Sequence, residues 1–326
     1  MNFGAGSVLA VRRPADAAAI VEAARLLRDG GLVAFPTETV YGLGADATNA
    51  AAVARLYAAK GRPSFNPLIA HLADAEAAMR EGAFSAAAMK LAARFWPGPL
   101  TLVVPLAKTS RICDLARAGL RTIGLRVPAH PAAHALLTEV ARPIAAPSAN
   151  RSGHVSPVSA EHVIEDLGQN IDLVLDGGPC TVGIESTIVA CIDDRARLLR
   201  PGGIAREAIE AVLGAPLAVI DGRASGGPIA PGMLASHYAP RAALRLDAAS
   251  LEPGEAGLDF GGRFPPGKHV LDLSAAGNTV EAAANLYAYL RRLDASGAEA
   301  IAVAPIPPQG LGDAIRDRLR RAAAPR

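Results

Sequence analysis

The feature that most constrains the fold is a regular alternation of short apolar runs with longer stretches in which apolar residues recur at helical spacing. Residues 16–29 show the helical spacing, begin after a capping position at Asp16 and end before Gly30 and Gly31. Residues 32–36 follow as a short buried strand. This order of elements is typical of a sheet covered by helices, so the chain is predicted to fold as an α/β protein.

The same reading divides the 326 residues into two α/β regions separated by a stretch rich in Gly, Pro and Ser at 221–241. Further strands are predicted at 67–72, 100–106, 122–127, 171–176, 184–190, 243–246, 257–260, 269–273 and 301–306, and further helices at 50–60, 85–95, 132–140, 159–167, 206–213, 279–293 and 312–322. We therefore predict a first domain over 1–207, a linker over 208–242 that packs toward the active site, and a small domain over 243–326.

Composition excludes several classes of function. The formal net charge is only +2, which argues against nucleic-acid binding driven by global charge. The three cysteines include no CxxC pair, so neither a disulfide framework nor a zinc ribbon is expected and a reducing compartment fits. Because the start of the chain lacks a secretory pattern and no run of about 18 apolar residues occurs, we expect a cytoplasmic protein without a membrane segment.

Familiar catalytic motifs are absent or incomplete. Residues 42–47 match GxGxxA, but PTETVY separates them from the preceding strand and no acidic residue follows at the spacing of a dinucleotide site. Residues 262–268 resemble a phosphate loop, yet His269 stands where Ser or Thr is required. No GxSxG segment occurs, so covalent catalysis has no visible nucleophile.

Four polar segments bounded by Gly or Pro lie beside predicted strands, namely 36–47, 60–72, 146–157 and 183–188. Several such loops together indicate a polar ligand held in a crevice. They carry hydroxyl and amide groups and glycines, among them Gly183, which would let backbone approach a ligand.

The cations of this region suit a polyanion bound beside a small zwitterion. They are Lys60, Arg62, Arg126 and Arg200, and arginine forks match the oxygens of phosphate or carboxylate. Two structural explanations compete with this interpretation. Any single arginine is commonly a solvated surface charge, and a cation such as Lys60 at the end of a helix also suits the helix dipole.

In this order, the segments PTETVYGLG, KGRPSFNPLI, WPGPLTLV, APSANRSG and ESTI resemble the YrdC-type domain of threonylcarbamoyl-AMP synthases. The resemblance covers roughly residues 15–207. The remainder resembles the extra C-terminal domain of the longer members, with PGMLASHYAP as the linker. The resemblance implies a YrdC-like twisted mixed sheet flanked by helices, followed by a smaller C-terminal α/β domain of Rossmann-like character.

The resemblance also implies residue roles. It implies a catalytic tetrad of Lys60, Arg62, Ser148 and Asn150. It implies ATP contacts from Lys60, Arg62, Asn66, Thr122, Ser148, Ser156, Arg200 and Tyr238, and threonine contacts from Thr39, His71, Arg126, Ala146 and Ser186. Taken singly, His71 is as well explained as an inward-facing strand residue, and Tyr238 as a buried anchor of the linker.

The implied activity is that of a nucleotidyltransferase. It makes L-threonylcarbamoyladenylate from L-threonine, bicarbonate and ATP with release of pyrophosphate, for threonylcarbamoyladenosine modification of tRNA. Mg²⁺ would accompany ATP without certain protein ligands, and no organic cofactor is expected. The product would pass to a tRNA threonylcarbamoyl transferase complex, and direct contact with tRNA is not required. A further expectation is that 221–241 forms a lid closed by Tyr238.

Two alternatives remain open. One is an RNA-binding module without catalysis, against which the near-zero net charge and the aromatic content of 4% speak. The other is a related enzyme that forms a carbamoyl-adenylate from another substrate.

Overall fold

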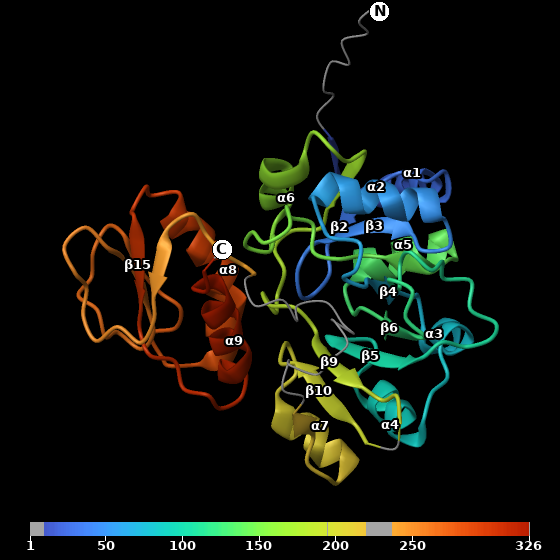
Figure 1. Ribbon diagram of the computed structural model, residues 1–326. Helices are drawn as coiled ribbons and strands as arrows, with labels where there is room; N and C mark the ends of the chain where they lie inside the picture. Colours follow the sequence, from blue (N-terminus) through green and yellow to red (C-terminus); the bar gives the residue numbers. More distant parts are fainter. Residues whose placement is uncertain (1–9, 194, 220–236, 326) are drawn as a thin grey trace, which may run out of the picture.

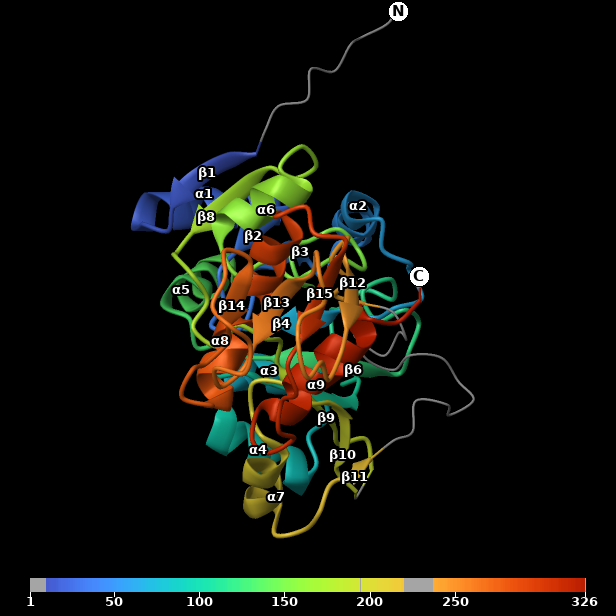
Figure 2. The ribbon, with the colours of Figure 1, turned by 90° about the vertical axis from the view of Figure 1, so that its left-hand side faces the viewer.

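The computed structural model describes residues 10–193, 195–219 and 237–325. They form an 11-stranded sheet in a large unit and a 4-stranded sheet in a smaller one, each covered by helices. Figure 1 shows the two units side by side, with helices α8 and α9 between the small sheet and the large unit, and Figure 2 shows the small unit in front of the large one. The predicted α/β class and mixed twisted sheet are confirmed, as is the smaller α/β unit. The predicted lid falls largely outside the described residues.

The helices are α1 (Ala17–Arg28), α2 (Ala50–Lys60), α3 (Ala75–Glu81), α4 (Ala86–Phe95), α5 (Pro131–Val140), α6 (Ala160–Leu167), α7 (Arg206–Leu213), α8 (Thr279–Asp294) and α9 (Gly312–Ala322). The strands of the large sheet are β1 (Val11–Pro14), β2 (Val33–Phe35), β3 (Gly42–Asp46), β4 (Ile69–His71), β5 (Leu100–Pro105), β6 (Thr122–Arg126), β7 (Ile144–Ala145), β8 (Leu173–Asp176), β9 (Thr187–Ala190), β10 (Arg197–Arg200) and β11 (Ala218–Val219). Those of the small sheet are β12 (Ala243–Arg245), β13 (Ala256–Asp259), β14 (Val270–Asp272) and β15 (Ala300–Val303).

The large sheet is mixed and has the strand order β1-β8-β2-β3-β7-β4-β6-β5-β9-β10-β11. Its middle joins strands that are far apart in the chain: β4 runs parallel to β6, β5 runs antiparallel to β6, and β5 runs parallel to β9. The four polar segments precede or follow these central strands or their neighbours, so the topology brings them to one region of the sheet.

The two faces of the central strands differ in chemistry because side chains alternate along a strand. On one face, Leu102, Leu125 and Val189 belong to the main core, which also takes in apolar residues of α4 and α7. Residues of the other face include Thr101, Gly124 and Arg126, beside a small apolar cluster containing Ile69 and Val103. A polar face lined by a few apolar side chains is the floor on which a ligand site can be built.

Helix α2 shows how local sequence places two of the predicted site residues. Asn49 caps its start by accepting from the amides of Ala51 and Ala52 at 3.0 and 3.2 Å. Its end is Gly61, whose left-handed φ of 59° suits glycine. The backbone therefore turns sharply between Lys60 and Arg62, and both side chains leave the helix end toward the interior.

The small sheet has the strand order β12-β15-β13-β14 and all its paired strands are parallel. Helix α8 begins at the Asn278 cap, and its Leu286, Tyr287 and Leu290 are buried. In the part of the chain that the structure describes, no helix combines the length and apolar character needed to cross a bilayer.

Several elements differ from the sequence predictions. The GxGxxA segment is strand β3, which pairs with β2 and β7, and it opens no helix. The elements α3, β1, β7, β10 and β11 were not predicted, because short or mixed-polarity segments carry little periodic signal. Helix α7 packs on α4 and β11 pairs with β10, so the large unit extends beyond residue 207, the limit predicted for the first domain.

Candidate active site

Lys60 is a buried ammonium group fixed by backbone carbonyls. Its side chain is 3% exposed, and its Nζ donates to the carbonyl oxygen of Ser148 at 2.5 Å and to that of Asn150. This contact joins the end of α2 to the segment 146–157. Burial, and then the charge of Arg62, hold the pKa of Lys60 well below its ordinary range.

Arg62 and Arg200 lie in the same region and are also buried. Arg62 donates to the carbonyl oxygens of Asn66 at 3.4 Å and Pro67 at 3.1 Å. Arg200 donates to the carbonyl oxygen of Ser186 at 3.0 Å. Burial, and to a smaller extent the charge of Arg200, lower the pKa of Arg62 to about 10. The two guanidinium groups are therefore close enough to repel each other.

These three cations have no carboxylate partner. Within residues 10–193, 195–219 and 237–325, none of Lys60, Arg62 and Arg200 forms an ion pair. Three buried positive charges that contact only neutral groups are costly unless an anion joins them. We name these residues the cation cluster. Its chemistry suits a polyanion such as a triphosphate.

The second half of the site is a buried ion pair at the end of β6. Arg126 donates to Glu38 at 2.7 Å, with side-chain exposures of 5% and 10%. Glu38 also accepts from the amide of Ala129 at 3.1 Å. Burial opposes ionisation of Glu38, but the charge and hydrogen bond of Arg126 together with backbone hydrogen bonds outweigh it and lower the pKa of the carboxyl group. A paired cation and anion of this kind match the two charges of a free amino acid.

His71 and Thr39 lie near this pair. The register places His71 on β4 directly beside Arg126 on β6. Burial lowers the pKa of His71 to about 3, and its buried Nδ1 has no hydrogen-bond partner among the described residues. Thr39 shares a hydrogen bond of 2.8 Å with Thr37. The amide of Ala146 donates to the carbonyl oxygen of Ile69, two positions before His71 on β4.

Ser186 connects the two halves. Its Oγ lies 2.8 Å from Oγ1 of Thr101 on β5 and 3.3 Å from Nη2 of Arg200. The strand β5 also pairs with β6, which carries Arg126. The predicted threonine contact Ser186 therefore lies between the cation cluster and the Arg126–Glu38 pair.

The remaining predicted residues fall into two groups. Asn66 and Asn150 each bury an Oδ1 atom that has no partner in the described part of the chain. The Nδ2 of Asn150 donates to the carbonyl oxygens of Arg151 and His154 at 2.7 and 2.9 Å, which fixes its amide and leaves Oδ1 as a free acceptor. Thr122 begins β6 and is partly exposed, and among the described residues its side chain forms no hydrogen bond to Lys60, Arg62 or Arg200.

Ser156 and Tyr238 contact protein groups. The Oγ of Ser156 donates to Glu185 at 2.5 Å. The ring of Tyr238 is buried, stacks on Tyr287 at 5.8 Å between centroids and lies 5.1 Å from the guanidinium carbon of Arg318. Burial raises the pKa of Tyr238, and the charges of Arg318 and Arg200 oppose this rise. Tyr238 is thus placed beside the cation cluster, and its ring also serves as an anchor.

Sequence reasoning missed five residues of this region: Glu38, Glu185, His237, Tyr287 and Arg318. Glu38 and Glu185 stand inside the segments 36–47 and 183–188, so attention to their carboxylates would have found them. Tyr287 and Arg318 lie on helices of the second unit, where no local signal separates them from the neighbouring polar residues.

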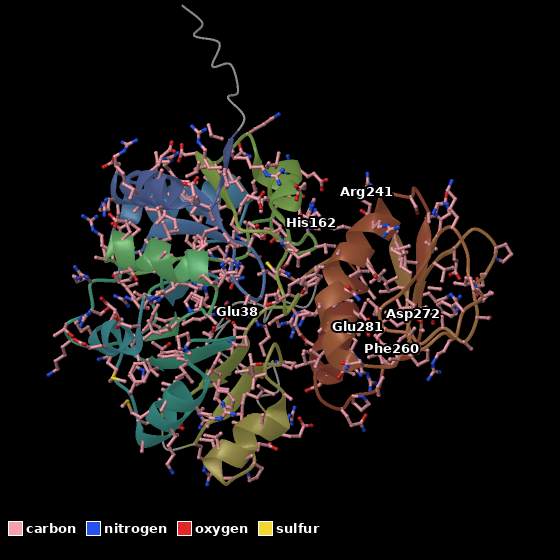
Figure 3. The ribbon with its side chains drawn as sticks, turned by 180° about the vertical axis from the view of Figure 1, so that it is seen from behind. Glu38, His162, Arg241, Phe260, Asp272 and Glu281 are labelled. Atoms are coloured by element: carbon pink, nitrogen blue, oxygen red, sulfur yellow. The ribbon has the colours of Figure 1, made fainter. Side chains whose placement is uncertain are left out.

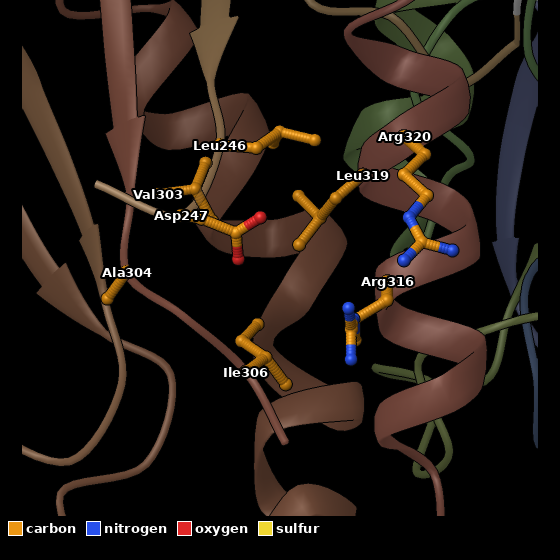
Figure 4. Close-up of a pocket in the computed structure, with 8 residues that line it drawn as sticks. All are labelled: Leu246, Asp247, Val303, Ala304, Ile306, Arg316, Leu319 and Arg320. Carbon is orange, nitrogen blue, oxygen red and sulfur yellow. The ribbon is translucent and has the colours of Figure 1, made fainter. Parts of the chain in front are cut away.

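The small unit holds a cavity of its own, which Figure 4 shows between the ends of β12 and β15 and helix α9. Leu246, Asp247, Arg316 and Arg320 are among its lining residues, and its volume is about 20 Å³. That space holds about one water molecule and no nucleotide. The cation cluster of the large unit is therefore the better candidate for a nucleotide site.

Comparison with known proteins agrees with this geometry. One family model, described as "Telomere recombination", matches residues 25–202, and a second, described as "Threonylcarbamoyl-AMP synthase, C-terminal domain", matches residues 204–324. The threonylcarbamoyl-AMP synthase of Bacillus subtilis is 45% identical over 94% of this chain and 93% of its own length. That of Pyrococcus abyssi is 41% identical over 92% of this chain and 93% of its own length.

A solved structure shares the complete fold. The crystal structure of P. abyssi Sua5 complexed with L-threonine superposes with a TM-score of 0.88 at 38% identity, and covers 97% of both chains. The family assignment rests on three findings: the two family models, the long matches to relatives and the shared two-unit fold. The chain therefore belongs to the threonylcarbamoyl-AMP synthase family, in the form that carries the additional C-terminal domain.

Proposed function

We propose that this chain makes L-threonylcarbamoyladenylate from L-threonine, bicarbonate and ATP, with release of pyrophosphate, for the threonylcarbamoyladenosine modification of tRNA. The observation that carries the proposal is the buried cation cluster, which has no carboxylate partner among the described residues, set beside the buried Arg126–Glu38 pair. The first supplies positive charge for a triphosphate and the second matches an amino acid. Relatives named for this activity and a related structure complexed with L-threonine support it.

The reaction has two stages. The amine of threonine condenses with bicarbonate to give a carbamate and water. A carbamate oxygen then attacks the α-phosphorus of ATP, the bond to the β-phosphate oxygen breaks, and pyrophosphate leaves. Both reactants of the second stage are anions, so their repulsion is the main obstacle. Fixed cations that need no reorganisation lower this barrier most effectively.

The cation cluster performs this electrostatic role. Lys60 uses two of its three N–H bonds on carbonyl oxygens, which leaves one for a phosphate oxygen. Arg62, just after the end of α2, and Arg200, at the end of β10, hold the triphosphate. Ser148 and Asn150 complete the tetrad, because their carbonyls fix Lys60 and the free Oδ1 of Asn150 accepts a further bond.

The amino acid occupies the end of the site at the Arg126–Glu38 pair, away from the cation cluster. The carboxylate of threonine lies against Arg126, and the neutral ring of His71 and the hydroxyl of Thr39 bond its polar groups. On β6, Thr122 and Arg126 share a face and lie four residues apart, roughly 13 Å along the strand. This length suits a nucleotide at one end and an amino acid at the other. The site thus holds both reactants together, which supplies a further gain by proximity.

Mg²⁺ fits this site as a companion of ATP. The unpartnered Oδ1 atoms of Asn66 and Asn150 are neutral oxygens of the kind that Mg²⁺ accepts beside phosphate and water. No group of three or more His, Cys, Asp or Glu in the described residues is arranged to hold a metal ion. When bound, Mg²⁺ neutralises part of the phosphate charge, while the protein side chains orient the phosphates.

The product is a mixed anhydride, which water hydrolyses readily. Transfer to a tRNA threonylcarbamoyl transferase complex would limit this loss, and the chain need not itself contact tRNA. A separate RNA-binding role is disfavoured, because Lys60, Arg62 and Arg200 are 3%, 9% and 4% exposed and offer no open surface to a nucleic-acid backbone.

The test is pyrophosphate release with ATP, Mg²⁺, bicarbonate and each of the twenty amino acids in turn. We expect a strong signal with threonine only, and its loss when bicarbonate is removed. Equal release with another amino acid would assign a different substrate. Salt-sensitive binding of RNA without any amino-acid-dependent release would favour the RNA-binding alternative.

A further inference from the structure

The second unit touches the large one at the loop that precedes β9. Gly183 in this loop has a φ of 75°, and a Cβ added there would lie 2.5 Å from the carbonyl oxygen of Ala283 and from Cα of Ala284. Gly183 therefore serves the approach of helix α8. This corrects the interpretation of Gly183 as a glycine that lets a ligand approach.

The contact brings two side chains of the second unit onto Glu185. Tyr287 of α8 donates to Oε2 of Glu185 at 2.8 Å, and Nε of Arg318 on α9 donates to the same oxygen at 2.7 Å. Ser156 donates to the other oxygen. Arg318 is fully buried and also donates to the carbonyl oxygen of Pro201 at 3.0 Å. The carboxylate thus accepts three hydrogen bonds, from residues of both units.

The position of Arg318 on its helix explains this reach. On α9, Arg316 and Arg320 line the small cavity on the side of the small sheet, as Figure 4 shows. Two residues along a helix correspond to about 200° of rotation, so Arg318 projects to the opposite side, toward the large unit. In Figure 3 the labelled Glu38 belongs to the large unit. Helices α8 and α9 lie on the side of the small unit that faces the large unit.

Glu185 is also electrostatically coupled to Arg200. It directly precedes Ser186, whose carbonyl oxygen fixes Arg200. Burial opposes ionisation of Glu185, but the charges of Arg318 and then of Arg200 outweigh it and lower the pKa of this carboxyl group to about 2. Two cations therefore act on the Glu185 carboxylate: Arg318 donates a hydrogen bond to it, whereas Arg200 donates its hydrogen bonds to Ser186.

We propose that Arg318, assisted by Tyr287, is a positioning residue that neutralises Glu185 and so leaves the charge of Arg200 free for the phosphates of ATP. The proposal rests on the proposed function, because it assigns ATP to the cation cluster. Without Arg318, the buried carboxylate would turn to Arg200, the cation that acts on it most strongly after Arg318. The C-terminal unit thus shapes the nucleotide site through one ion pair, although neither Arg318 nor Tyr287 touches a substrate.

The test measures the affinity of full-length variants by calorimetry, with Mg²⁺ and α,β-methylene ATP as the probe. Arg318→Met should raise the Kd by roughly tenfold or more, because Arg200 loses a charged contact to phosphate. The double variant Glu185→Gln, Arg318→Met removes both charges of the pair, so its Kd should return to within about threefold of wild type. Arg320→Met, an exposed arginine on the same helix, is the control and should leave the Kd unchanged.

A purely structural role predicts a different pattern. If Arg318 only joins the two units, the double variant binds ATP as weakly as Arg318→Met, and this result would overturn the inference. Unchanged affinity of Arg318→Met would overturn it as well. Threonine-dependent release of pyrophosphate by the wild type, measured separately, shows whether the proposed function itself holds.

A milder variant keeps the test decisive if Arg318→Met does not fold. Tyr287→Phe removes one hydroxyl donor from Glu185 and preserves the ring that stacks on Tyr238. We expect a smaller rise in the Kd for the ATP analogue, about threefold to tenfold. Tyr289→Phe on the same helix is its matched control. Equal affinities of the two variants would contradict the inference.

Discussion

Replacing Lys60 by methionine isolates the charge at the centre of the site. Methionine has a similar length and volume, so Lys60→Met removes the ammonium group with little change in packing. The two carbonyl oxygens of Ser148 and Asn150 lose their donor, while the cost of burying a cation disappears. These effects oppose each other, so the free energy of unfolding should stay within about 2 kcal/mol of wild type.

Activity should respond far more strongly than stability. Loss of one preorganised donor to the developing negative charge costs about 3–4 kcal/mol, or on the order of a thousandfold in turnover. The assay is pyrophosphate release at saturating threonine, with thermal unfolding measured on the same preparation. Lys90→Met, which changes an exposed lysine on α4, is the control. A folded Lys60→Met protein that keeps more than about a tenth of wild-type turnover would refute the reasoning.

Three further predictions use other parts of the structure. Arg126→Met should raise the KM for threonine by roughly tenfold or more and leave the KM for ATP nearly unchanged, when each substrate is titrated in the pyrophosphate-release assay. Equal effects on both KM values would contradict the assignment of threonine to Arg126 and of ATP to the cation cluster. Gly183→Ala should lower the free energy of unfolding, measured in urea, by about 1–3 kcal/mol, because the added Cβ would collide with α8. Gly119→Ala is the control and should lower it less, because Gly119 has a similar φ of 72° but no atom lies near the added Cβ. Because the pKa of Glu185 is lowered from 4.5 to about 2, its stabilisation is complete above pH 4.5 and is lost as the pH falls toward 2. The free energy of unfolding in urea should fall by roughly 3 kcal/mol across this window through this group, and a free energy that does not change with pH would contradict the prediction.

The periodic elements of the fold could be predicted from the sequence. Helices such as α1, α2 and α8 have apolar residues at helical spacing and a side-chain cap at Asp16, Asn49 and Asn278. The segment at Gly42–Asp46 could not be predicted as a strand, because its glycines and its polar neighbours resemble a loop. Its strand character depends on pairing with β2 and β7, which are distant in the sequence.

The candidate site could be predicted in part. The cations of the cluster stand in short motifs, and the structure brings Lys60, Arg62 and Arg200 into one buried region. The counter-ions could not be predicted, because pairing depends on register and on packing between units. Glu38 reaches Arg126 across 88 positions of the chain, and Arg318 reaches Glu185 across 133. Whether each predicted residue contacts its assigned substrate stays a prediction.

The most direct test of the central claim is a crystal structure of this chain with α,β-methylene ATP, Mg²⁺ and L-threonine. The account predicts phosphate oxygens within hydrogen-bond distance of Lys60, Arg62 and Arg200, and the threonine carboxylate against Arg126. A nucleotide bound away from these residues, with the three buried cations still lacking an anion, would contradict it.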